Sequence, residues 1–173
     1  MKVLRFFDGL AVLKNRKKNG KLMLIMNRLK KYQVEIMVNK NGPPVEHPLC
    51  DAIEYILHLP SWCRRLSQKS LFLTEEWIRY VQIMENGNDP SSCFPNEFIE
   101  KCEKFCYESL RELQSIKKNV NRKIYEFKEI STVDYSFQSS FKLLSDVYDQ
   151  FLYPMLDTLE KNINVFLANI NSA

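Results

Sequence analysis

From residue 98 onward, the sequence carries apolar side chains at three- and four-residue intervals on a charge-rich background. Because an α-helix has 3.6 residues per turn, this spacing lines the apolar side chains up along one side of a helix. This helical spacing of apolar residues occupies two stretches, residues 98–127 and 137–170. We predict two amphipathic helices joined by a turn at Ser131-Thr132. They would form a long antiparallel hairpin whose apolar seam is covered by further helices or by a partner chain.

The rest of the sequence also favours helices over a sheet. The chain holds only four glycines, and a sheet built from tight turns needs more of them. We therefore predict an all-α fold of about six to seven helices, arranged as a multi-helix bundle or as stacked helix pairs. Pro154 lies inside the last predicted helix and should kink it, because its ring opposes the carbonyl of Gln150.

The N-terminal segments are shorter. Apolar residues between Val3 and Leu13 recur at helical spacing and predict a first helix. Residues 15–20 contain no apolar side chain and end in Asn-Gly, which predicts a turn before a second helix begins at Lys21. Residues 32–38 fit either the end of that helix or a strand, because apolar and polar residues alternate there.

Prolines and capping residues divide the middle of the chain. Residues 48–57 predict a short helix that Pro60 ends, and Ser61 could cap one further turn. Thr74 should cap the next helix, and Asn86-Gly87 should stop it. Residues 88–94 read as a loop. We predict a single domain over residues 1–173. The loop 88–94 could divide this domain into two sub-units, residues 1–87 and 95–173.

Cysteine usage and hydropathy indicate the compartment. The five cysteines form an odd set, and Cys102 and Cys106 lie one turn apart on an apolar stripe, which favours reduced, buried thiols. No stretch approaches the roughly 20 apolar residues that span a bilayer, and charges interrupt the N-terminus where a signal peptide would be apolar. We expect an intracellular protein, nuclear or cytoplasmic, that does not contact membranes. The alternative is a secreted four-helix, cytokine-like ligand trimmed of its leader.

Positive charge is concentrated near the N-terminus. Residues 1–41 hold eleven Lys or Arg against two acidic residues, although the net charge of the chain is only +4. This segment could bind a nucleic acid or an acidic partner, or it could pack against the acidic helices of the same fold. The residues that would make such a contact are Arg16, Lys17, Lys18, Lys21, Arg28, Lys30 and Lys31.

Motifs for catalysis and cofactor binding are missing from the sequence. His47, Cys50, His58 and Cys63 surround one short predicted helix, but no zinc-ligand spacing such as C-x-x-C is present. Glu75 and Glu76 are explained as acids at a helix start. The sequence has no phosphate-binding glycine loop and no nucleophile elbow. We therefore predict no enzyme activity, no cofactor and no metal.

Binding to another protein is the function that remains. Eleven Phe, eight Tyr and two Trp supply large apolar side chains. Trp62, Trp77 and Phe94 lie near predicted loops, where an exposed ring could anchor a helical or extended partner segment. We predict a non-catalytic helical protein–protein interaction or scaffold domain. The alternative is RNA or DNA binding through the basic segment 14–31.

Overall fold

The structure, a computed structural model, describes residues 16–38, 48–87 and 96–172. Within these residues the chain is helical and contains no strand, so the predicted all-α class is confirmed. The first predicted helix (3–13), Phe94 and the predicted loop 88–94 lie outside the described residues. The division of the chain into sub-units stays a prediction.

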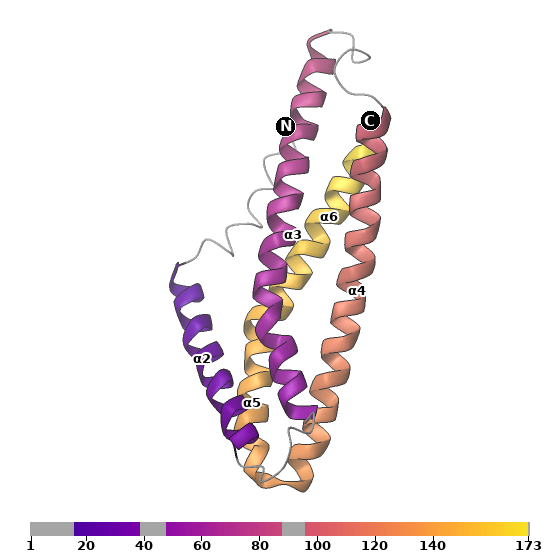
Figure 1. Ribbon diagram of the computed structural model, residues 1–173. Helices are drawn as coiled ribbons and strands as arrows, with labels where there is room; N and C mark the ends of the chain where they lie inside the picture. The colour runs from indigo at the N-terminus through magenta and orange to yellow at the C-terminus, as the bar shows by residue number, and fades with distance from the viewer. Residues whose placement is uncertain (1–15, 39–47, 88–95, 173) are drawn as a thin grey trace.

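Four helical rods make up the described part of the chain (Figure 1). The first three rods are single helices, α2 (Arg16–Val38), α3 (Pro48–Glu85) and α4 (Asn96–Val133). The fourth is a succession of α5 (Gln138–Val147), the π-helical turn η5 (Tyr148–Leu152) and α6 (Tyr153–Asn171). The helices α3, α4 and α6 lie side by side along their length. The shorter α2 packs on α3 and α5 at one end of the bundle.

The predicted count of six to seven helices is not supported over the described residues, because Pro60 does not end a helix. Residues 48–85 form one helix of 38 residues that includes Pro60. Apolar side chains continue in phase across the proline, since Ile56, Leu59 and Cys63 are all buried. A proline in a helix interior costs about 3 kcal/mol, whereas burial of each leucine or isoleucine contributes roughly 1.5–3 kcal/mol. The free energy gained by burying the continuous apolar stripe therefore exceeds the free energy lost at Pro60.

Thr74 lies inside this long helix and not at its start. Its hydroxyl donates a hydrogen bond to the carbonyl of Ser70 at 2.7 Å, the bond that a buried threonine makes to the preceding helical turn. Of the two acids that follow, Glu76 pairs with Arg79 at 2.8 Å. The predicted helix stop is confirmed: Gly87 has φ +72°, and its N–H donates to the carbonyl of Met84.

The turn predicted over residues 15–20 is wrong for its described part, since α2 begins at Arg16 and includes Gly20. Residues 32–38 are helical, which settles the choice between helix and strand. The side chains of Leu22, Met26 and Leu29 are buried on one side of α2. Gln33 ties the helix to α3, because its Nε2 donates to the carbonyl of Cys50 at 3.4 Å.

After α4 the chain reverses at Asp134, and not at Ser131-Thr132, which form the last turn of α4. The Asp134 carboxylate accepts hydrogen bonds from the Ser136 N–H at 3.0 Å and from the Ser136 hydroxyl at 2.6 Å. These bonds favour the charged form, so they lower the pKa of Asp134. They also organise the 3-10 turn η4 (Tyr135–Phe137), which leads into α5.

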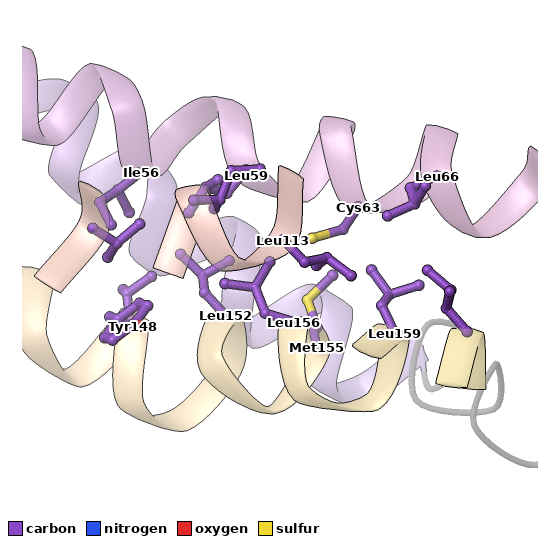
Figure 2. Close-up of a cluster of buried hydrophobic side chains, with 14 of the residues drawn as sticks. Ile56, Leu59, Cys63, Leu66, Leu113, Tyr148, Leu152, Met155, Leu156 and Leu159 are labelled. Carbon is purple, nitrogen blue, oxygen red and sulfur yellow. The ribbon is translucent and has the colours of Figure 1, made fainter. Parts of the chain in front are cut away.

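One contiguous cluster of buried apolar side chains runs through the bundle and draws on α2, α3, α4 and the fourth rod. Figure 2 shows its centre, where side chains of α3 and of the fourth rod point toward one another with Leu113 of α4 between them. Three of the cysteines, Cys63, Cys102 and Cys106, are buried in this cluster as free thiols. The burial of Cys102 and Cys106 agrees with the expectation that these two side chains belong to the core.

A π-helical turn immediately precedes Pro154. The N–H of Tyr153 donates to the carbonyl of Tyr148, five residues earlier, so the turn is one residue wider than an α-helical turn. Pro154 has no N–H to donate, so the regular series of helical backbone hydrogen bonds is interrupted there. The wider turn lies at this interruption. Tyr148 lies at the start of this turn. It is buried, and its hydroxyl has no hydrogen-bond partner among the residues that the structure describes.

An ion-pair network joins α4 to α6. The ammonium of Lys117 pairs with Glu160 and lies 3.9 Å from Asp157, which in turn pairs with Lys161 at 2.8 Å. The same ammonium lies 5.4 Å from the centre of the Tyr153 ring, within cation–π range. Only 18% of the Lys117 side chain is exposed, so these contacts are partly shielded from water and help to align the two helices.

We expect Tyr148→Phe to raise the free energy of unfolding by about 1 kcal/mol, because it removes a buried hydroxyl for which the described residues supply no hydrogen-bond partner. Urea denaturation measures the change. Tyr153→Phe is the matched control and should have little effect, since Tyr153 is 46% exposed. A loss of stability in Tyr148→Phe would show that the hydroxyl is bonded in the folded protein.

We also expect the protein to lose stability as the pH rises above about 9. Burial raises the pKa of Cys63 and Cys106 to about 12 and that of Cys102 to about 11, from 9.0 for a free thiol. Between these values the unfolded chain releases thiol protons that the folded chain retains. The stabilisation is therefore complete below pH 9 and is lost as the pH rises toward 11–12.

Urea denaturation at pH 9 to 11 tests this dependence. Cys63→Ala removes one thiol proton that the folded chain retains and the unfolded chain releases. The free energy of unfolding should therefore fall less steeply with pH, by about 1.4 kcal/mol per pH unit. Ser67→Ala is the control and should leave the slope unchanged, because it alters a buried side chain of α3 that does not titrate in this range. Equal slopes for the wild type and Cys63→Ala would contradict a protonated Cys63 in the folded core.

Candidate groove between α3 and α4

A groove of about 530 Å³ lies between α3 and α4, and we call it the α3–α4 groove. Its α3 side is formed by Asp51, Glu54, Tyr55, His58, Leu59, Trp62 and Arg65, and its α4 side by Glu112 and Ile116. The positions on α3 recur at three- and four-residue spacing, so they form a second stripe beside the buried one. This stripe is aromatic and charged, whereas the neighbouring stripe is apolar.

Leu59 and Ile116 connect the groove to the hydrophobic core. Both side chains are largely buried, at 3% and 8% exposure, and both also belong to the core cluster. Figure 2 shows Leu59 pointing from α3 toward the side chains of the fourth rod. The groove therefore has an apolar floor held by core packing, which gives the polar residues around it a rigid support.

Trp62 is held in place across the groove. Its indole Nε1–H donates to Oε1 of Glu112 at 2.8 Å, a hydrogen bond between residues fifty positions apart in the sequence. The ring remains partly exposed and packs against the core at its edge. The bond fixes the indole and the carboxylate together, so both present a defined surface to solvent.

A second aromatic side chain, Tyr55, lies two turns before Trp62 on the same stripe. The ammonium of Lys123 on α4 is 5.6 Å from the centre of its ring, within the range of a cation–π interaction. Between the two aromatic residues lies His58, whose Nε2 is 3.8 Å from Oε1 of Glu54. The side chains of His58 and Glu54 are 77% and 62% exposed, so solvent reaches them freely.

The other aromatic residues predicted to bind a partner are placed differently. Trp77 is only 4% exposed and packs against Tyr80 and Phe166, with ring centres 5.2 and 6.3 Å away. Its ring belongs to the core, so the prediction that it anchors a partner is corrected. The reason is that Trp77 continues the buried stripe of an unbroken α3 and is not next to a loop. Phe94 lies outside the described residues.

The basic residues of α2 form a separate surface. Lys21, Arg28, Lys30 and Lys31 are exposed. Helical geometry places Lys21, Arg28 and Lys31 on one side of α2 and Lys30 on another. Arg16, Lys17 and Lys18 lie in the first turns of α2, but their side chains are outside the description.

Among the described ion pairs, the only one on α2 joins Lys31 to Glu35 of the same helix at 3.9 Å. The alternative in which the basic segment pairs with the acidic helices is therefore not seen for Lys21, Arg28, Lys30 or Lys31.

No group of three or more potential metal ligands comes together among the described residues. His58 is exposed in the groove, whereas Cys63 is fully buried on another side of α3, so these two side chains do not meet. Burial raises the pKa of the Cys63 thiol to about 12, which leaves little nucleophilic thiolate at neutral pH.

Sequence reasoning missed most of the groove. Of its residues, only Trp62 was singled out as a partner-binding position. Asp51, Tyr55 and Arg65 share its stripe, and their spacing becomes visible once residues 48–85 are treated as one helix. Glu112 could not be placed from spacing, because its position depends on the register between α3 and α4.

No helix in the described ranges has the length and apolar character needed to cross a membrane. Comparisons with protein-family models, with curated proteins and with solved structures found no match to this chain. A helical bundle by itself does not specify an activity, so the chemistry of the groove and of the α2 surface carries the functional information.

Proposed function

We propose that the chain is a non-catalytic helical interaction domain that acts in the nucleus or cytoplasm and binds a segment of another protein in the α3–α4 groove. The observation that carries this proposal is Trp62, a partly exposed indole that is hydrogen-bonded across the groove to Glu112. Tryptophan is among the residues most enriched at the energetic centres of protein interfaces.

The fixed position of the indole favours binding. An interface side chain that must be ordered on binding costs about 0.5–1.5 kcal/mol, and a side chain already held in place avoids much of that loss. The Nε1–H of Trp62 already has an acceptor, so a partner that covers the ring leaves no unsatisfied donor. Leu59 and Ile116 supply the apolar part of the groove lining.

The dimensions of the groove suit a peptide segment. From Asp51 to Arg65 the α3 stripe covers fourteen residue steps, or about 21 Å at 1.5 Å per residue. An extended chain advances about 3.3 Å per residue, so roughly six residues would occupy this length. A partner segment of that size can contact both the aromatic and the charged residues of the stripe.

Selection from a displayed library of random hexapeptides tests this function. We expect the wild-type domain to enrich a family of peptides, and Trp62→Ala to lose at least tenfold of their affinity because the central aromatic contact is removed. Tyr125→Ala is the matched control. Tyr125 is an exposed aromatic residue of α4 outside the groove, so its removal should leave binding intact.

Circular dichroism and thermal unfolding should show that both variants remain folded. Equal affinity of the wild type and Trp62→Ala for the selected peptides would contradict binding in the α3–α4 groove. Loss of binding in Tyr125→Ala alone would place the contact surface elsewhere on α4.

Nucleic-acid binding through α2 is the second candidate. Lys21, Arg28 and Lys31 lie on one exposed side of this helix, and neither Lys21 nor Arg28 takes part in a described ion pair. Phosphate contacts by such residues release counterions, so the affinity would fall steeply as salt concentration rises.

Titration of a single-stranded RNA and of a DNA duplex at 50–200 mM salt tests this candidate. If α2 binds phosphates, Lys21→Glu with Arg28→Glu should reduce the slope of log affinity against log salt by about two. Lys30→Glu, on another side of the helix, is the control and should have a smaller effect. Identical slopes for the wild type and the double variant would contradict a nucleic-acid role for this surface.

A further inference from the structure

We propose that the α3–α4 groove recognises a basic segment of the partner, with an arginine side chain placed on the Trp62 ring beside Glu112. This inference rests on the proposed function and specifies its ligand. It is carried by the charges of the groove, by the partly exposed ring of Trp62, over which no described cation lies, and by the position of Glu112.

The groove carries more negative than positive charge. Three carboxylates line it, those of Asp51, Glu54 and Glu112, against the lining cation Arg65 and the ammonium of Lys123 beside the Tyr55 ring. No described Lys or Arg forms an ion pair with any of these three carboxylates, and the described histidine of the groove, His58, lies 3.8 Å from Glu54. A cationic ligand would therefore complete the charge complementarity of the groove.

Aromatic rings in this bundle already hold cations. Lys123 lies 5.6 Å from the Tyr55 ring centre, and Lys69 lies 5.2 Å from that of Phe105. No described cation occupies the face of Trp62, although indole is the aromatic side chain that attracts cations most strongly. The Trp62 ring, which lines the groove and is partly exposed, can therefore bind a cation supplied by a ligand.

Glu112 is positioned to bind the same cation. Its Oε1 accepts the Trp62 Nε1–H at 2.8 Å, which places a carboxylate at the edge of the indole. A carboxylate has about four acceptor sites, so Oε2 and the remaining lone pairs can receive N–H donors from a ligand. A cation on the Trp62 face can therefore make a cation–π contact and a charge-assisted hydrogen bond at once.

Arginine fits this arrangement better than lysine. Its guanidinium group is planar, stacks on aromatic faces and presents several N–H donors in one plane, whereas an ammonium group is a compact, strongly hydrated charge. Arg65 lies one turn beyond Trp62 on α3 and repels a second basic residue there. Further basic residues of the ligand should therefore lie toward Asp51 and Glu54, at the other end of the groove.

The composition of the hexapeptides selected by the wild-type domain tests this inference. We expect arginine to be enriched among the peptides whose binding depends on Trp62. In the strongest of these peptides, replacing arginine by citrulline removes the charge and keeps the shape. This change should weaken binding about tenfold or more, because it removes the charge-assisted contacts.

Glu112→Gln locates the contact, because glutamine retains an acceptor for the Trp62 Nε1–H and removes the negative charge. We expect the arginine peptide to bind this variant as weakly as the citrulline peptide binds the wild type, with little further loss when both changes are combined. Glu100→Lys is the control for net charge. Glu100 is exposed near the start of α4, away from the groove, so its reversal should change binding little.

The outcomes separate the two proposals. If Trp62-dependent peptides are selected but lack basic residues, or if citrulline binds as well as arginine, the basic-ligand inference is overturned and the interaction function stands. If no selected peptide depends on Trp62, the proposed function fails and the inference fails with it.

Discussion

The bundle depends on one helix, α3, which passes through Pro60 without ending. At Pro60 the helix lacks one backbone donor, and the ring opposes the carbonyl of Ile56. Buried side chains before and after the proline, among them Leu59 and Cys63, lie on the same side of the helix. Ending the helix at residue 60 would place those side chains on different faces. Their burial contributes several kcal/mol, more than the roughly 3 kcal/mol lost at a helical proline.

Continuity of α3 also creates the groove. A helix of this length presents two stripes over the same turns, one apolar and buried, the other carrying Tyr55, Trp62 and the charged residues. The buried stripe fixes how α3 rotates about its axis, and this rotation turns the second stripe toward α4. Packing of the two helices then brings Glu112 within 2.8 Å of Trp62, so the energetics of the core determine the geometry of the surface site.

Much of the architecture could be predicted from side-chain periodicity, because burial of apolar stripes dominates helix packing. The helical class and the stop at Gly87 followed from local pattern. Pro60 predicted a helix end and Thr74 a helix start, but both lie inside α3 because tertiary packing overrides these local signals. Thr74 donates its hydroxyl hydrogen bond back to Ser70 within the helix. Trp62 could be singled out as a large aromatic residue. Its hydrogen bond to Glu112 could not be predicted, because sequence spacing does not show which residues of two different helices come into contact.

The most direct test of this account is residue-resolved amide hydrogen exchange along α3 by NMR. If the helix is continuous, the amides of Trp62, Cys63 and Arg64 bond to carbonyls before or at Pro60 and should be protected like those of the neighbouring turns. If a new helix began at Ser61, these amides would fall in its first turn and have no helical partner. Exchange of the three amides at the rate of an unstructured peptide, with protection retained on both sides, would contradict an unbroken α3 and the groove that depends on it.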